Sequence, residues 1–74
     1  MTKLPVVSGK AAVNTFLKAG WYVDRIRGSH AVMLKPGHIA SLSIPQHKEL
    51  SPGTLRSLIR ASGMMVEEFS VLLK

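Results

Sequence analysis

The sequence predicts an α+β fold in the order helix, three strands, two helices, with a three-stranded antiparallel sheet and all helices on one face. Apolar residues recur at helical spacing before residue 20 and after residue 51, and three short β-favouring stretches lie between these segments. Turn signals separate those stretches, so consecutive strands are expected to pair as a meander. Packing the helical stripes against one face of the sheet is the economical way to bury them.

The first helix is predicted to begin at Ser8, a favoured N-cap residue, and to run to about Ala19. Gly20 follows at the position where a helix commonly ends in a left-handed residue. Helical spacing places one apolar side on this segment, formed by Ala12, Val13, Phe16, Leu17 and Ala19. The opposite side carries Lys10, Asn14 and Lys18 and is expected to face water.

Three strands are predicted over residues 21–27, 31–35 and 39–44. Gly28-Ser29 joins the first two, because a type II′ turn needs a positive φ at its first central position and glycine supplies it. Arg27 and His30 are then expected to face each other across the hairpin. Pro36-Gly37 predicts a type II turn before the third strand, and Pro45 ends the sheet because it cannot donate a ladder hydrogen bond.

The second helix is predicted to start at Ser51-Pro52, a capping serine followed by proline in the first turn, and to stop at Gly63. Leu55, Leu58 and Ile59 form its apolar stripe, and Arg56 and Arg60 form a basic edge. A short last helix carries Val66, Phe69, Leu72 and Leu73 on one side. Together with Trp21 as a core residue, these elements are expected to form a single domain over residues 1–74.

The charge balance is strongly basic. The 74 residues include 10 Lys and Arg against four Asp and Glu, giving a formal net charge of +6, which favours a nucleic acid or another acidic partner. The chain has no cysteine, which excludes disulfides and thiolate metal sites. The sequence shows neither an apolar run of membrane-spanning length nor a secretion signal, so a cytoplasmic protein without a membrane partner is expected.

Three histidines could carry chemistry: His30 at the hairpin, His38 in the second turn and His47 before the second helix. None has the spacing of a metal site, and no metal or other cofactor is expected. Metal-free RNA cleavage remains, because RNA carries its own nucleophile, the 2′-hydroxyl. Histidine can serve as general base or acid, and cations stabilise the charged phosphorane. His30 is the candidate catalytic residue; the alternative is a purely structural histidine at a strand end.

Several motifs, in this order, resemble the HicA (YcfA-like) family of mRNA interferase toxins. They lie at residues 8–10, 19–21, 27–30, 44–50 and 52–60, and the match continues through Gly63 to the Glu67-Glu68-Phe69 segment. Gly-Ser-His alone is a weak signal. Followed at this distance by Pro-x-His-Lys-Glu-Leu and Gly-Thr-Leu-Arg, it is highly specific, and the match covers nearly the whole chain.

The resemblance implies a fold similar to double-stranded-RNA-binding domains and ribonuclease activity resting on the hairpin histidine, His30. It also implies a type II toxin–antitoxin role, with a HicB-type antitoxin that covers the His30 site. His47 matches a recurrent motif position, where we expect a structural role in the loop. Met65 departs from the pattern, because relatives often place a capping residue there.

Candidate RNA contacts follow from charge and from nearness to the hairpin in sequence. They are Arg25, Arg27, Gly28, Ser29, Lys35, Lys48 and Arg56. One alternative is a non-catalytic double-stranded-RNA-binding module, but such modules usually have a lysine cluster where this chain has Ser51-Pro52-Gly53-Thr54. A second alternative is an adaptor whose basic surface binds an acidic protein.

Overall fold

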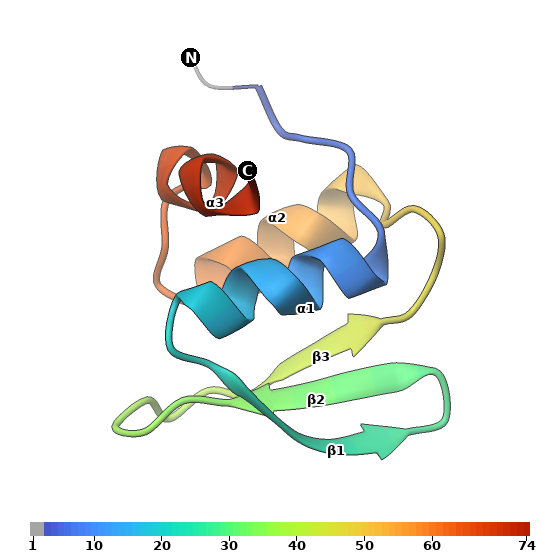
Figure 1. Cartoon of the computed structure of the whole chain (residues 1–74), viewed down its shortest axis with the longest axis vertical. Coiled ribbons are helices and arrows are strands. Elements are labelled where there is room, and N and C mark those ends of the chain that lie inside the picture. Colours follow the sequence, from blue (N-terminus) through green and yellow to red (C-terminus); the bar gives the residue numbers. More distant parts are fainter. Residues whose placement is uncertain (1–2) are drawn as a thin grey trace.

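The computed structural model describes residues 3–74. The elements are α1 (Gly9–Lys18), β1 (Tyr22–Arg27), β2 (His30–Leu34), β3 (Leu42–Pro45), α2 (Pro52–Ala61) and α3 (Val66–Leu73). The strands form one antiparallel sheet in the order β1-β2-β3. Helices α1 and α2 lie over one face of this sheet, and α3 lies on their far side (Figure 1). The predicted α+β class, element order and one-sided helical layer are confirmed.

The helix ends follow the local sequence signals. The Ser8 hydroxyl accepts a hydrogen bond from the Ala11 N–H at 3.0 Å, and the Ser51 hydroxyl accepts one from the Thr54 N–H at 3.3 Å. Met65 is the N-cap residue of α3 and has no conventional capping side chain, but Glu68 supplies a capping hydrogen bond instead. The Glu68 carboxylate there accepts a hydrogen bond from the Met65 N–H at 2.8 Å, so one free donor of the first turn is satisfied.

The core lies between the helices and the inner face of the sheet. Phe16 is fully buried at its centre, with ring-centroid distances of 6.4 Å to Trp21 and 5.2 Å to Phe69. The same cluster contains Ala12, Met33, Leu42, Ile44, Leu50, Leu55, Leu58 and Ile59. Trp21 is therefore a core residue, as predicted.

Two positions of α1 differ from the predicted apolar side. Leu17 is 45% exposed, whereas Thr15 is almost fully buried. The Thr15 hydroxyl donates to the Ala11 carbonyl at 2.8 Å, so burial leaves no unsatisfied donor. Thr15 thus occupies the buried face beside Phe16, and Leu17 lies at its edge.

The third strand was predicted over residues 39–44, and this boundary is wrong. The strand begins at Leu42, opposite Met33, and residues 39–41 lie outside the ladder. The type II turn itself forms, with Gly37 at φ 79° and the His38 N–H donating to the Lys35 carbonyl at 3.0 Å. The His38 ring packs on Trp21, with 4.9 Å between the ring centroids. This contact directs the chain toward the core before it rejoins the sheet at Leu42.

Lys18 connects the ends of two helices. Its ammonium donates to the carbonyls of Leu72 at 3.0 Å and Lys74 at 3.1 Å, where the carbonyls at the end of α3 lack partners in the helix. We expect Lys18→Met to lower the free energy of unfolding by about 0.3–1 kcal/mol, because a cation at a helix C-terminus is lost. Chemical denaturation measures this change, and Lys10→Met on the same helix is the control. An unchanged unfolding free energy would contradict the capping role.

Candidate functional site

The hairpin between β1 and β2 presents His30 at the first position of the central strand, β2. Gly28 has a φ of 58°, the positive value that a type II′ turn needs at its first central position. Among residues 3–74 only glycines have a positive φ, so Ser29 at the second central position has a negative one, as this turn type requires. Arg27 pairs with His30, as predicted, and His30 also pairs with Pro45 of β3. The histidine is therefore held in the central strand, between two neighbours.

One face of the sheet points away from the helices. Ala31 and Met33 lie opposite Ile44 and Leu42, and all four are buried on the helical side. Because side chains alternate along a strand, His30 belongs to the other face. Arg25 and Arg27 lie opposite Val32 and His30, so both arginines share that face with the histidine.

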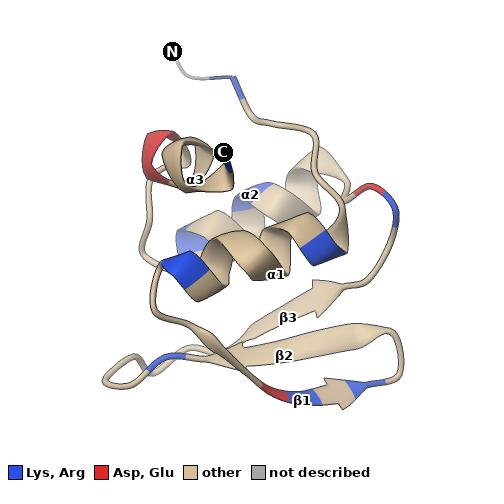
Figure 2. Cartoon of the chain, viewed as in Figure 1, with Lys and Arg blue, Asp and Glu red and all other residues tan. Residues whose placement is uncertain are grey.

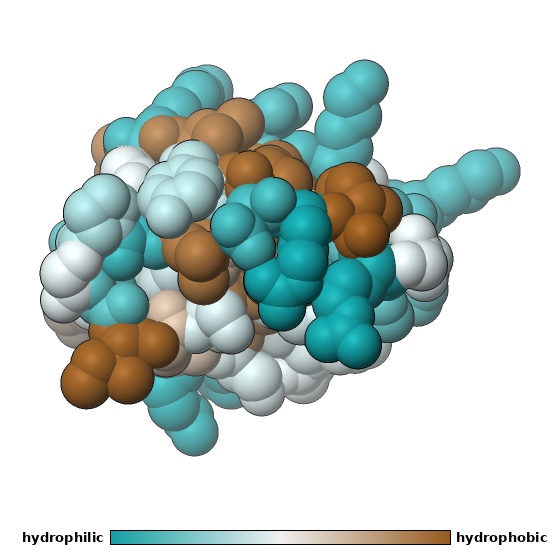
Figure 3. All heavy atoms as spheres, turned by 90° about the horizontal axis from the view of Figure 1, so that it is seen from below, coloured by the Kyte–Doolittle hydropathy of each residue, from teal (hydrophilic) through white to brown (hydrophobic). Residues whose placement is uncertain are grey.

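These side chains line one open hollow on the outer face. Its lining consists of Arg25, Arg27, His30, Val32 and Ser43. Val32 is only 7% exposed and forms an apolar floor, while Ser43 contributes a hydroxyl from the third strand. Figure 3 views the molecule from this side and shows hydrophilic groups next to hydrophobic ones. The hollow thus combines an imidazole with two guanidinium groups.

Asp24 is the acidic residue beside the hollow. It has no partner in the register between β1 and β2, and its carboxylate forms an exposed ion pair with Arg25. Exposed pairs of this kind are weak, so an anion can compete with Asp24 for the guanidinium.

The segment after β3 is hydrogen-bonded to the hairpin turn between β1 and β2. The Gln46 N–H donates to the Ser29 carbonyl at 2.7 Å, and the Gly9 N–H donates to the His47 carbonyl at 2.9 Å. A Cβ atom on Gly9 would lie 2.1 Å from the Pro45 carbonyl oxygen, so only glycine allows this approach. The start of α1, residues 45–47 and the hairpin are therefore one connected unit, which accounts physically for the Ser8-Gly9 and Pro45-Gln46-His47 motifs.

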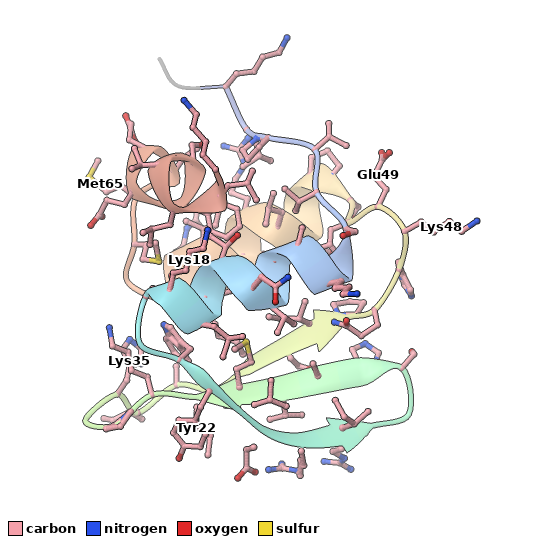
Figure 4. The ribbon with its side chains drawn as sticks, in the orientation of Figure 1. Lys18, Tyr22, Lys35, Lys48, Glu49 and Met65 are labelled. Carbon is pink, nitrogen blue, oxygen red and sulfur yellow. The ribbon has the colours of Figure 1, made fainter. Side chains whose placement is uncertain are left out.

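Three of the predicted RNA-contacting residues lie away from the hollow. Lys35 follows the opposite end of β2 and borders a different hollow between α1 and α3. Arg56 lies on α2, next to Arg60 and the start of α3. Lys48 points outward from the loop before α2 (Figure 4). The Lys and Arg positions are thus distributed over helices, loops and β1 (Figure 2). The arginines of β1 line the hollow together with His30.

The other two histidines lie outside the hollow. The His38 ring packs on Trp21, and its Nδ1 is buried without a hydrogen-bond partner within the described part of the chain. His47 has an exposed side chain, and it is the backbone carbonyl of His47 that binds Gly9. The loop role expected for His47 is therefore carried by its main chain.

Ser43, Val32 and Tyr22 were not selected as site residues from the sequence. In the sequence, Ser41 and Ser43 alternate with Ala40, Leu42 and Ile44, a pattern typical of a strand with one polar face, and this is the signal that points to Ser43. Within residues 3–74, no group of three His, Asp or Glu side chains is arranged to hold a metal ion, and no helix is long and apolar enough to cross a membrane.

Comparison with known proteins gives one result. A family model described as the HicA toxin of bacterial toxin-antitoxin systems matches residues 9–64, which contain the hairpin, all three strands and α2. No curated protein matches the chain.

Proposed function

This chain belongs to the HicA toxin family of bacterial toxin–antitoxin systems, and we propose that it is an endoribonuclease that cuts messenger RNA without a metal ion. The observation that carries the proposal is the hollow in which His30 lies with Arg25 and Arg27. A basic protein with a net charge of +6 attracts RNA. The hollow provides a histidine for one proton transfer and two cations for the phosphate.

The proposed reaction breaks the bond between phosphorus and the 5′-oxygen of the next nucleotide. The ribose 2′-oxygen attacks phosphorus, its proton passes to a base, and the leaving 5′-oxygen takes a proton from an acid. The products are a 2′,3′-cyclic phosphate and a 5′-hydroxyl. His30 performs one of the two proton transfers, and water performs the other.

The two arginines stabilise negative charge at the phosphate. Charge builds up on the equatorial oxygens as the phosphorane forms, and guanidinium groups bind such oxygens through paired N–H donors. Arg27 is opposite His30 in the strand register, so it lies closer to the His30 imidazole along the sheet than Arg25 does. Gly28 shapes the turn and lets the backbone approach the phosphate, and Ser29 positions the scissile phosphate or His30.

The predicted partner protein is a HicB-type antitoxin that covers the same hollow. An antitoxin segment that places a carboxylate between Arg25 and Arg27 satisfies both guanidinium groups and excludes RNA. We also propose that the toxin acts in the cytoplasm, where messenger RNA is available.

The decisive experiment incubates the purified full chain, free of antitoxin, with single-stranded RNA in excess EDTA. We expect cleavage products that end in a 2′,3′-cyclic phosphate, and no cleavage where the ribose at the cut site is replaced by 2′-deoxyribose. Intact RNA would overturn the proposal. Duplex binding without cleavage would favour the double-stranded-RNA-binding module, and no RNA interaction would leave the protein-binding adaptor.

Asp24 is expected to weaken RNA binding, because its carboxylate occupies Arg25 and repels phosphate. Asp24→Asn should tighten binding of a 2′-deoxy-blocked RNA by up to about fivefold, the equivalent of an exposed ion pair worth about 0.2–1 kcal/mol. Fluorescence anisotropy measures the affinity. Glu67→Gln on α3 makes the same change in net charge elsewhere and should have a smaller effect. Equal effects of the two variants would assign the gain to net charge alone.

A further inference from the structure

Tyr22 is an exposed aromatic side chain that the reaction described above does not use. It is 47% exposed, whereas the adjacent Trp21 is 2% exposed and packs in the core. In Figure 4 the Tyr22 side chain extends from the start of β1 away from the helical layer. An aromatic ring in this setting is not explained by core packing.

A β-bulge brings Tyr22 onto the face that carries the arginines. In a regular strand, Tyr22 would point to the side opposite Arg25 and Arg27. The register instead shifts between Val23 and Arg25, which leaves Asp24 without a partner. A bulge inserts one extra residue and thereby re-aims the side chains that follow it.

The pairing across β2 gives the same result. Tyr22 lies opposite Leu34, Arg25 opposite Val32 and Arg27 opposite His30. Leu34, Val32 and His30 alternate along β2 and share one face, so their partners share it too. Tyr22, Arg25, Arg27 and His30 therefore follow one another across a single surface, which we call the outer sheet face.

The length of this face matches a short stretch of nucleic acid. Tyr22 and His30 are separated by the four steps from Leu34 to His30 along β2, or about 13 Å at about 3.3 Å per residue. Stacked nucleotides in one strand advance by about 3.4 Å each, so the distance corresponds to roughly four nucleotides. Arg25 lies midway along this span, opposite Val32, and Arg27 lies at its His30 end, where phosphates of the same strand would pass.

We propose that Tyr22 is a base-stacking subsite for single-stranded RNA, several nucleotides away from the bond cut at His30. The proposal rests on the proposed ribonuclease function and adds a substrate-binding residue to it. Open sheet faces with exposed aromatic rings bind unpaired bases by stacking, and flanking cations bind the backbone. Paired bases cannot lie flat on the ring, so the subsite selects single strands over duplexes.

The charge of the outer sheet face favours RNA over an apolar protein segment as its occupant. Arg25 and Arg27 flank the path from Tyr22 to His30, and Asp24 is the one acid on β1. The apolar side chains at the floor are small in exposed area, since Val32 is buried and Leu34 is half-buried. In an RNA strand, the phosphates can pair with the two arginines while a base stacks on the Tyr22 ring.

The test compares Tyr22→Leu with Tyr22→Phe in the full chain, on single-stranded RNAs blocked by 2′-deoxyribose at the mapped cut site. Tyr22→Leu should weaken binding about 5- to 150-fold, the range for loss of one base–aromatic stack. Tyr22→Phe keeps the ring and should bind close to wild type. Val71→Ala, which changes an exposed apolar residue of α3, should leave binding unchanged. With cleavable RNA, Tyr22→Leu should raise KM and leave kcat nearly unchanged.

RNA length gives the sharper measurement. As the RNA is shortened from each end, the difference between wild type and Tyr22→Leu should disappear once the strand no longer reaches from the cut site to residue 22. Ultraviolet crosslinking of the unmodified protein should attach the long RNA to the peptide that contains Tyr22, a result that does not depend on the folding of a variant.

The outcomes separate the two proposals. If wild type cuts RNA and Tyr22→Leu binds every RNA equally well, the subsite is overturned and the ribonuclease function stands. The subsite is also overturned if Tyr22→Leu lowers the affinity equally for all RNA lengths. The same holds if Tyr22→Leu weakens binding of the antitoxin but not binding of RNA. If wild type neither binds nor cuts RNA, the proposed function fails together with the subsite.

Discussion

His30→Ala should reduce the rate of RNA cleavage by about 10²–10⁴-fold, the contribution of one positioned general acid or base. Because Arg25 and Arg27 remain in the hollow, RNA should still bind with nearly wild-type affinity. The expected signature is therefore a fall in kcat with little change in KM. Single-turnover cleavage of a labelled single-stranded RNA, measured in EDTA, gives the chemical rate directly.

The fold should tolerate this substitution. His30 is partly exposed at a strand end, and changes at such positions usually alter stability by no more than about 0.5 kcal/mol. His47→Ala is the matched control, since the His47 side chain is exposed and lies outside the hollow; it should retain the wild-type rate. An unfolded His30→Ala protein, or an equal loss of rate in both variants, would remove the catalytic assignment.

Gly9→Ala should lower the free energy of unfolding by about 3 kcal/mol, at the upper end of the usual cost of forcing extra atoms into a packed site. The new Cβ would lie 2.1 Å from the Pro45 carbonyl oxygen and 2.8 Å from the Gln46 Cα, and both are backbone atoms that cannot rotate away. A domain of 74 residues has little stability to lose. Denaturant unfolding followed by circular dichroism measures the loss.

Cleavage should fall in the same variant even where it remains folded. Residues 45–47 must move to admit the methyl group, and this movement breaks the hydrogen bond from the Gln46 N–H to the Ser29 carbonyl of the hairpin. Gly53→Ala is the control, because a Cβ built there meets no atom within 4 Å from residues 3–74 beyond its chain neighbours and its own helix backbone, and alanine favours a helix. It should leave stability unchanged or raise it. A Gly9→Ala protein as stable and as active as wild type would show that this approach does not support the site.

Local chemistry explains how much of the fold was predictable. A positive φ at Gly28 and Gly37, and serine caps at Ser8 and Ser51, are properties of a few consecutive residues, and each formed where the sequence indicated. The start of β3 was not predictable in this way. Residues 40–44 alternate apolar and polar side chains like a strand, but residues 39–41 lie outside the ladder. They follow a turn whose His38 ring packs on Trp21, a contact between distant parts of the chain.

The candidate site likewise has features that the local sequence predicts and features that depend on the tertiary structure. The hairpin register predicted the facing pair of Arg27 and His30, since a two-residue turn determines which residues oppose each other. Charge alone gave no means of separating Arg25, which lines the hollow, from Lys35 and Arg56, which lie on other surfaces. Tyr22 was missed because its face depends on the bulge at Asp24, which leaves no pattern in the residue types.

By itself, the amino-acid sequence determined the order of the elements, the two glycine turns, the helix caps and the histidine at the hairpin, because these depend on backbone preferences and spacing within a few residues. Tertiary structure alone decided which arginines lie beside that histidine, why Gly9 must lack a side chain, and which way Tyr22 points. Those features depend on strand register and on close approach between segments far apart in the chain, and such distances are set only when the sheet and helices pack together.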